Sequence, residues 1–304
     1  MQYSKTDTGA AVFPVTDLNL KQTLDCGQSF RWDERPDGSF YGTAFGKTVT
    51  ARMENDTLYL DGATVKDAKA VWTDYFDLRF DYVAVKDALS QLHPVLREAA
   101  AFAPGMHILN QDSWEALCSF IISQNNNIKR IKGIVARLCE GFGEQRDGVY
   151  GFPLPETLAK LTPDDLAPIR CGFRAGYLLD AARKVACGEV DLGRIRKMET
   201  GKASEELMKI KGVGPKVAQC ALLYGMHRLE CFPLDVWMKR AMARLFPDLA
   251  PEDFGEYAGI AQQYISIYMQ EHPIRLIGTG ISSGRYATPF KKWADTEYQG
   301  RKKR

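Results

Sequence analysis

The sequence lacks the features that mark several classes of protein. It has no pair of cysteines separated by two residues, no apolar run near the roughly 20 residues that span a bilayer, and no apolar core of the kind found in secretion signals. Its net charge is only +2, from 40 basic and 38 acidic residues, which excludes a uniformly basic coat for nucleic acid. The seven cysteines are an odd number. We therefore expect free thiols, no membrane role and a cytoplasmic location, nucleoid-associated in a bacterium or nuclear in a eukaryote.

The composition and the residue pattern indicate two domains. Of the 304 residues, 45% are hydrophobic and 26% are charged, as in ordinary globular proteins. Between residues 13 and 62, short runs rich in aromatic and β-branched residues alternate with turn signals, which predicts an antiparallel meander. Strands are expected at 39–43, 48–53 and 57–60, followed by a helix over 64–78.

Helical periodicity dominates from about residue 105 onward. Helices are expected after a cap at Asp112 or Ser113, over 128–141, 163–169 and 175–187, on both sides of a turn at 211–214, and over 255–269. We predict an α+β fold, with an N-terminal antiparallel β-rich domain over 1–104, an α-helical domain over 105–290 and a basic tail over 291–304.

The turn at 211–214 is the most informative part of the chain. Gly212 and Gly214 permit a tight turn, and Pro215 fits the first turn of a helix, where its missing N–H costs nothing. Uncovered backbone amides and the positive end of a helix dipole attract an anion. The pattern predicts a helix–hairpin–helix element that binds a DNA phosphate. The alternative is a plain connecting turn between core helices.

Lys216 and Asp235 are the candidate catalytic pair. Lys216 lies in the first turn of a predicted helix, where the dipole and partial burial would favour the neutral, nucleophilic amine. Asp235 follows after about one helix and one loop, so its carboxylate can return towards the lysine. In the alternative, Lys216 only contacts a phosphate and Asp235 only caps the helix that follows it.

These residues resemble the helix–hairpin–helix DNA glycosylases, and within them the 8-oxoguanine DNA glycosylases. Besides the Lys216–Asp235 region, three blocks carry the resemblance: 26–32 (CGQSFRW), 123–130 (SQNNNIKR) and 172–175 (GFRA). The four cysteines that hold an iron–sulfur cluster in endonuclease-III-like relatives have no counterpart, because the last cysteine here is Cys231. The resemblance covers about residues 13 to 270.

The resemblance implies a bifunctional DNA glycosylase and AP lyase that removes 8-oxoguanine opposite cytosine. The damaged base would leave the duplex and enter a pocket. Lys216 would attack the anomeric carbon and form a Schiff base, whose β-elimination nicks the strand, while Asp235 would stabilise the positive charge of the sugar. No metal and no organic cofactor are expected, because the lysine amine supplies the covalent chemistry.

The resemblance also assigns three residues to the damaged base. The carbonyl of Gly27 would accept from N7–H, which 8-oxoguanine has and guanine lacks, while Cys220 would lie against the base plane and Gln262 would bind the Watson–Crick edge. Without the resemblance, Gly27 is a loop glycine, Cys220 a small buried helix residue and Gln262 a surface polar residue.

The remaining predicted site residues would contact DNA beyond the damaged base. Asn125 would fill the vacated space, Arg130 and Arg174 would donate to the orphaned cytosine, and Phe173 would wedge beside it. The alternatives are solvated arginines and a core phenylalanine, and the run of three asparagines is expected to form a turn. The full set of predicted DNA contacts is Asn125, Arg130, Phe173, Arg174, Gly212, Gly214 and Trp237.

The sequence departs from the family pattern at three positions. The eukaryotic branch has histidine where this chain has Trp237 and tyrosine where it has Phe173. Ser266 stands where an aromatic residue commonly faces the base, and Tyr264, Ile267 or Tyr268 could compensate.

We expect a monomer whose partner is double-stranded DNA containing oxidised guanine. The alternatives are a related glycosylase for alkylated or other oxidised bases, a non-catalytic DNA-binding protein, and a helical protein-interaction domain.

Overall fold

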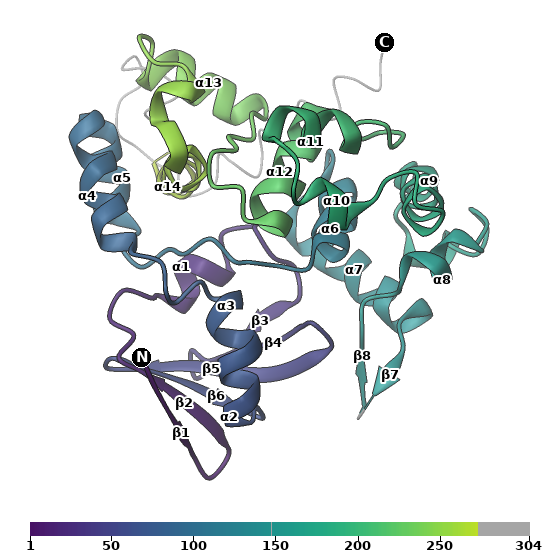
Figure 1. The fold of residues 1–304 in the computed structure, drawn as a ribbon, viewed down its shortest axis with the longest axis horizontal. Coiled ribbons are helices and arrows are strands. Elements are labelled where there is room, and N and C mark those ends of the chain that lie inside the picture. Colours follow the sequence, from purple (N-terminus) through teal and green to yellow (C-terminus); the bar gives the residue numbers. More distant parts are fainter. Residues whose placement is uncertain (147, 273–304) are drawn as a thin grey trace, which may run out of the picture.

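The computed structural model describes residues 1–146 and 148–272. A twisted antiparallel sheet lies at one end of the molecule and a larger body of helices at the other (Figure 1). The sheet comes first in the chain, so the predicted α+β class and its order of domains are confirmed. Among the described residues, no helix is both long enough and apolar enough to cross a membrane.

The N-terminal sheet has six strands in the order β1-β2-β6-β5-β4-β3. Their bounds are β1 (Gln2–Lys5), β2 (Gly9–Phe13), β3 (Trp32–Glu34), β4 (Phe40–Ala44), β5 (Lys47–Glu54) and β6 (Thr57–Asp61). The three predicted strands correspond to β4, β5 and β6. The strands β1 and β2 were not predicted, because their small and polar residues carry little alternation of apolar side chains.

A helical segment covers one face of the sheet and closes the smaller of two cores. It consists of α2 (Val65–Asp67), a π-helical turn η1 (Ala68–Trp72) and α3 (Thr73–Tyr75), close to the predicted 64–78. Thr64 and Asp67 form a capping box at its start. Trp72 packs edge-on against Trp32 of the sheet, with ring centroids 5.9 Å apart, and both side chains are fully buried.

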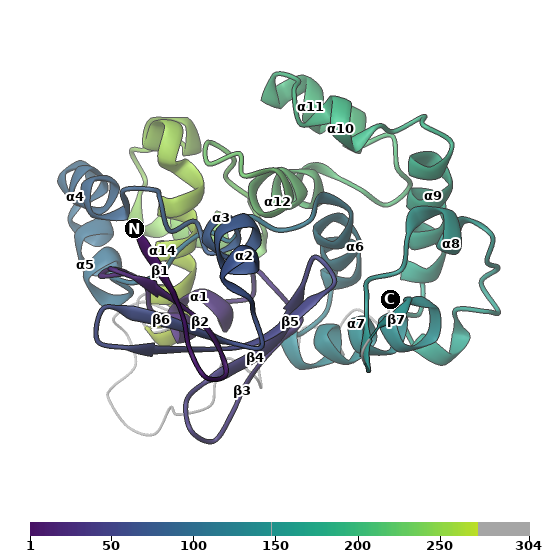
Figure 2. The same ribbon diagram turned by 60° about the horizontal axis from the view of Figure 1, so that its bottom comes forward.

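The helical body contains the larger core, and α12 runs between α6 and α14 (Figure 2). The remaining helices are α1 (Leu20–Leu24), α4 (Tyr82–Leu92), α5 (Pro94–Phe102), α6 (Ser113–Ser123), α7 (Ile128–Phe142), α8 (Pro155–Ala159), η2 (Ala167–Ile169), α9 (Arg174–Ala186), α10 (Leu192–Ile195), α11 (Thr200–Leu207), α12 (Pro215–Met226), α13 (Val236–Leu245), η3 (Pro251–Tyr257) and α14 (Ala258–Glu271). A short hairpin of β7 (Gln145–Arg146) and β8 (Val149–Tyr150) extends from the side of this body.

Several helices differ from the expected ones. The segment 163–169 forms only the short 3-10 helix η2, because Pro168 inside it cannot donate an α-helical hydrogen bond. The helix α8 before it was not predicted. The last helix begins at Ala258 rather than at Gly255, whose φ of +65° is not helical. The helix α1 lies inside the region interpreted as a meander.

The helices α4 and α5 pack into the larger core, although the predicted domain over 1–104 joined them to the sheet. Leu89 and Leu96 are buried there together with residues of α14. The physical reason is that their apolar faces match those of the other helices and not the sheet. The predicted domain boundaries themselves stay predictions, and the predicted basic tail over 291–304 lies outside the described residues.

Candidate active site

The predicted hairpin connects α11 to α12. Gly212 has a φ of +80°, and a Cβ atom there would lie 2.3 Å from the Tyr177 ring, so only glycine fits. Gly214 is the N-cap of α12 and Pro215 its first residue, and no side chain caps this helix. The first amides of α12 therefore remain available to an external anion.

The helix α9 holds this hairpin in place. The Lys211 N–H donates to Asp180 Oδ2 at 2.7 Å, and Lys184 Nζ donates to the Lys209 carbonyl at 2.5 Å. Tyr177, on the same helix, packs against Gly212. The position of the hairpin is thus fixed by three residues from a helix that begins at Arg174, another predicted DNA contact.

Lys216 is half-buried in the first turn of α12. Its Nζ lies 5.6 Å from the ring centroid of Phe120, and Cys220 stands one turn later on α12. Burial raises the pKa of the Cys220 thiol. The charge of Lys216 opposes this rise, and the negative charge of Asp235 adds to it. The structure therefore brings Lys216, Cys220 and Asp235 into one neighbourhood.

Asp235 is the N-cap of α13, as one of its two interpretations predicted. Its Oδ1 accepts from the Met238 N–H at 2.7 Å, while the residue remains exposed. A capping carboxylate is fixed in orientation by the helix that it begins. Trp237 lies in the first turn of α13, partly exposed, with the Arg240 guanidinium 5.6 Å from its ring centroid.

The loop between α1 and β3 presents Gly27 next to α7. Gly27 has a φ of +86°, which favours glycine, and a Cβ there would meet Ile128 at 3.5 Å. The buried Gln28 fixes the loop: its Nε2 donates to the carbonyls of Thr23 and His107, both at 2.8 Å, and its Oε1 accepts from the Leu109 N–H at 2.9 Å. The loop carrying Gly27 is therefore rigidly attached to the segment that precedes α6.

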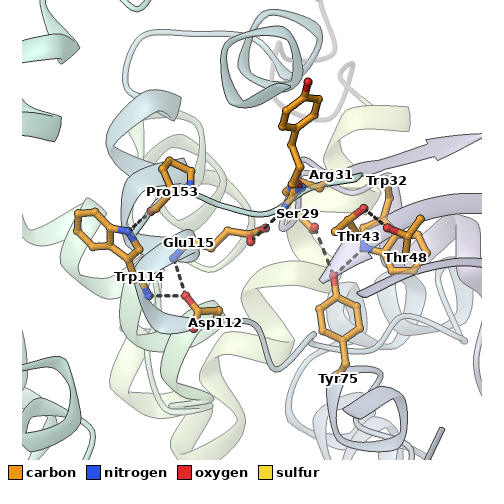
Figure 3. Close-up of polar contacts among 11 residues, drawn as sticks. Ser29, Arg31, Trp32, Thr43, Thr48, Tyr75, Asp112, Trp114, Glu115 and Pro153 are labelled. Carbon is orange, nitrogen blue, oxygen red and sulfur yellow. Dashed lines mark hydrogen bonds and ion pairs between the residues drawn. The ribbon is translucent and has the colours of Figure 1, made fainter. Parts of the chain in front are cut away.

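Arg31 connects the same loop to α6 and to the β7–β8 hairpin (Figure 3). Its guanidinium lies 3.4 Å from Glu115 Oε2 and also donates to the Tyr150 carbonyl. Burial raises the pKa of the Glu115 carboxyl to about 7, and the charge of Arg31 opposes this rise. The next residue in the chain, Trp32, donates from Nε1 to the Tyr75 hydroxyl at 2.7 Å.

The helix α14 supplies Gln262, which is buried and not at the surface. Its side chain is 8% exposed, and no hydrogen-bond partner for Oε1 is found among the described residues. The neighbouring Gln263 has a different environment, because its Oε1 accepts from the Tyr224 hydroxyl at 2.6 Å and its Nε2 donates to the Cys26 carbonyl at 3.3 Å. Gln263 thereby joins α14, α12 and the Gly27 loop.

Two of the three residues suggested as substitutes for the missing aromatic wall face elsewhere. Tyr264 is fully buried in the larger core, and the hydroxyl of Tyr268 donates to Glu98 of α5. Ile267 is partly buried and Ser266 half-exposed. The expectation that Tyr264 or Tyr268 would compensate is therefore not supported by their positions.

The run of three asparagines forms the predicted turn between α6 and α7. Asn125 is exposed with a φ of +48°, Asn126 Nδ2 donates to the Ile122 carbonyl at 3.0 Å, and Asn127 caps α7. Arg174 holds this turn in place through hydrogen bonds to its backbone. Its guanidinium is buried and donates to the carbonyls of Gln124, Asn125 and Cys171.

Phe173 and Arg130 are exposed beside this turn. Phe173 is 55% exposed, which excludes the interpretation as a core phenylalanine, and the Arg174 guanidinium lies 4.4 Å from its ring centroid. Arg130 Nη2 approaches the Arg170 carbonyl at 3.5 Å. Arg174, in contrast, is not the solvated arginine of the alternative interpretation, and its predicted contact with cytosine stays a prediction.

The structure thus brings Lys216, Cys220 and Asp235 together, and Gln263 ties the Gly27 loop and α14 to α12. The sequence analysis missed Phe120, Tyr224 and Gln263. Phe120 stacks on Tyr224 with ring centroids 5.0 Å apart. Their apolar or amide side chains gave no signal, because each acts only through contacts between distant segments. No group of three or more potential metal ligands occurs within 1–146 and 148–272.

The fold and site correspond to a base-excision class of helix–hairpin–helix proteins. Residues 118–253 match the family model of the HhH-GPD superfamily base excision DNA repair protein, and residues 11–117 match the 8-oxoguanine DNA glycosylase, N-terminal domain. The chain is 33% identical over 267 residues to the N-glycosylase/DNA lyase of Saccharomyces cerevisiae, which covers 78% of this chain and 70% of that protein.

Solved structures give the same result. One described as MBOgg1 in complex with a low-affinity DNA ligand is 42% identical, with a TM-score of 0.84, over 90% of this chain and 100% of that one. The 8-oxoguanine glycosylase/lyase of Clostridium acetobutylicum, in complex with double-stranded DNA containing cytosine opposite 8-oxoguanine, is 35% identical, with a TM-score of 0.84, over 90% of this chain and 99% of that one. The chain belongs to the 8-oxoguanine DNA glycosylase family.

Proposed function

We propose that this protein excises 8-oxoguanine opposite cytosine from duplex DNA and then nicks the strand as an AP lyase. Its family membership and the names of its relatives support both activities. The observation that carries the assignment to residues is that Lys216 stands half-buried in the first turn of α12, with its Nζ 5.6 Å from the Phe120 ring centroid, while Lys216 and Asp235 both act electrostatically on the Cys220 thiol. That arrangement puts a primary amine and a carboxylate within electrostatic range of the same buried, polarizable thiol.

In the proposed reaction, the Lys216 amine attacks C1′ of the flipped nucleotide. The C1′–N9 bond breaks and its electron pair leaves with the base, which is then protonated. Opening of the sugar ring gives an imine between Nζ and C1′. Loss of a proton from C2′ expels the 3′ phosphate, and the strand is nicked. The carboxylate of Asp235 stabilises the positive charge that develops on the sugar, and its capping bond to Met238 fixes its orientation.

Recognition of the base is proposed to rest on two acceptors. The Gly27 carbonyl accepts from N7–H of 8-oxoguanine, whereas guanine presents a lone pair there and is repelled. Gln262 Oε1, which lacks a partner among the described residues, accepts from the N1–H and N2–H donors of the Watson–Crick edge. A buried acceptor without a partner carries a desolvation cost that such a ligand would offset.

The exposed residues next to the asparagine turn are proposed to contact the orphaned cytosine. Asn125 enters the vacated space, while Phe173 wedges beside it and Arg130 donates to the cytosine edge. Arg174 supports this group by holding the carbonyls of Asn125 and Gln124. The hairpin with Gly212 and Gly214 binds a backbone phosphate. A monomeric state and a location with the cellular DNA remain part of this proposal.

Borohydride trapping on a duplex with one 8-oxoguanine–cytosine pair tests the proposal. The wild-type protein is expected to give a covalent protein–DNA adduct. Lys216→Gln should abolish the adduct and lower excision by about a thousandfold or more, because the nucleophile is lost. Lys211→Gln removes the same charge from the same hairpin and should retain the adduct. If Lys216→Gln still releases the base and forms the adduct, another residue is the nucleophile.

A further inference from the structure

The turn between η2 and α9 collects positively charged side chains. Arg137 Nε donates to the Ile169 carbonyl at 3.0 Å, Arg174 Nη1 donates to the Cys171 carbonyl at 3.1 Å, and Arg130 Nη2 approaches the Arg170 carbonyl at 3.5 Å. Burial raises the pKa of the Cys171 thiol, and all three arginines oppose that rise. The local field at this turn is therefore positive.

Arg170 adds a fourth guanidinium at the tip of the turn. Its backbone is left-handed, with a φ of +61°, and its side chain is exposed. It forms no ion pair with any described residue. The carboxylate of Asp165, on the segment leading into the turn, instead accepts from the Thr162 N–H and hydroxyl at 2.8 and 2.7 Å. The guanidinium of Arg170 is thus available to an external anion.

A hollow of about 380 Å³ lies directly beside Arg170. Its other lining is apolar or small, with Pro163, Leu166, Ala167 and Ala175 among its residues. A cation next to an apolar hollow suits one nucleotide of a DNA strand. The cation can bind the charged phosphate, and the hollow can receive the carbon atoms of the sugar. Phe173, which directly follows Gly172 of the lining, is itself exposed.

We propose that Arg170 binds a backbone phosphate of the undamaged DNA strand and that the hollow receives the sugar next to that phosphate. The strand assignment rests on the proposed function, in which Arg130 and Phe173 face the cytosine opposite the lesion. Arg130 approaches the backbone carbonyl of Arg170, so the proposal assigns both residues to the same strand. The phosphate hairpin is a separate contact, since it is held by Tyr177 and Asp180, further along α9.

The test compares Arg170→Ala with Arg97→Ala in equilibrium binding to a lesion-containing duplex and to the same lesion strand alone. Arg97 is an exposed arginine of α5, which lies on the opposite side of the molecule from α8 and α9 in both views (Figures 1 and 2). Arg170→Ala is expected to weaken duplex binding by about five- to tenfold and to lower the salt slope by about one. Its effect on the single strand should match that of Arg97→Ala.

Two further measurements identify the partner of Arg170. In the first, a neutral methylphosphonate replaces one phosphate at a time along the undamaged strand. At one position it should weaken duplex binding by the wild-type protein by a similar factor, and at that position it should cause no further loss of binding by Arg170→Ala. Ala167→Glu, at an exposed position of the hollow, should weaken duplex binding. The change in melting temperature that it causes should be no larger than the change caused by Arg97→Ala.

Two results would overturn the proposal: equal duplex affinities for Arg170→Ala and Arg97→Ala, or an equal loss for Arg170→Ala on duplex and single strand. Excision activity is read separately. If the wild-type protein did not excise 8-oxoguanine but Arg170→Ala still weakened duplex binding selectively, the proposed function would fail while the phosphate contact would stand.

Discussion

At the scale of single residues, two adjacent buried glutamines differ in whether the hydrogen bonds of their amides are satisfied. Gln263 uses both ends of its amide, on Tyr224 and on the Cys26 carbonyl. Gln262 is also buried, but its Oε1 finds no partner among the described residues. An unpaired buried acceptor costs roughly 1–3 kcal/mol, so its presence points to a ligand that satisfies it.

The pair of glutamines gives a matched prediction. Gln262→Ala should lower kcat/KM for 8-oxoguanine excision by about ten- to a hundredfold, because the base loses an acceptor, and should change the free energy of unfolding little. Gln263→Ala should cost about 2–3 kcal/mol of stability, because the Tyr224 hydroxyl and the Cys26 carbonyl lose their partners. Single-turnover excision and urea unfolding measure the two effects. The reverse distribution of effects would contradict these roles.

At the scale of elements, the ion pair of Arg31 and Glu115 attaches the Gly27 loop to α6. Burial makes the contribution of Glu115 itself to stability depend on pH, because it raises the pKa of this carboxyl from 4.5 to about 7 and so favours its protonated form. The folded protein therefore binds a proton at Glu115 more tightly than the unfolded chain does. The stabilisation from this group is complete below about pH 4.5 and is lost as the pH rises through about 7.

We expect Glu115→Gln to remove this dependence. Relative to the variant, the unfolding free energy of the wild-type protein should fall by about 3 kcal/mol between pH 4.5 and pH 7.5, as the shift of the Glu115 pKa implies. Urea unfolding at a series of pH values measures it. Glu140→Gln, at an exposed position of α7, is the control and should follow the wild type. Parallel curves for the wild type and Glu115→Gln would refute the assignment.

At the scale of the whole molecule, two hydrophobic cores must keep a fixed relation, because the site draws on both bodies. Gly27 follows α1 at the edge of the sheet body, whereas Lys216 and Gln262 lie on helices of the larger core. Gln28 binds Thr23 on one side and, on the other, the 107–109 segment, in which Ile108 is buried in the larger core and Leu109 in the smaller one. Its buried amide therefore makes three hydrogen bonds at the junction of the two bodies.

Replacing that amide should loosen the junction. Gln28→Ala is expected to cost about 3 kcal/mol or more, since two carbonyls and an N–H lose their partner. It should also separate the unfolding curves followed by tryptophan fluorescence and by far-UV circular dichroism, which should coincide in the wild type. Gln22→Ala is the control, because Gln22 binds Gly105 and Phe102 from a half-exposed position. Equal stabilities of the two variants would show that Gln28 does not join the cores.

The sequence by itself determined the order of the domains, the hairpin, the capping Asp235 and the turn at the asparagines. Each of these depends on residues close together in the chain: Gly212 needs a positive φ, Pro215 fits a first helical turn, and Asn127 caps the helix it precedes. Such local requirements are visible in the residue types.

Only the tertiary structure decided which side chains are buried and which segments meet. It attached α4 and α5 to the larger core, buried Gln262 and Arg174, and exposed Phe173. It also revealed Gln263 and Phe120 as the connections between the Gly27 loop and α12. The reason is that burial and contacts across long stretches of chain depend on how whole elements pack, and no residue type encodes that packing on its own.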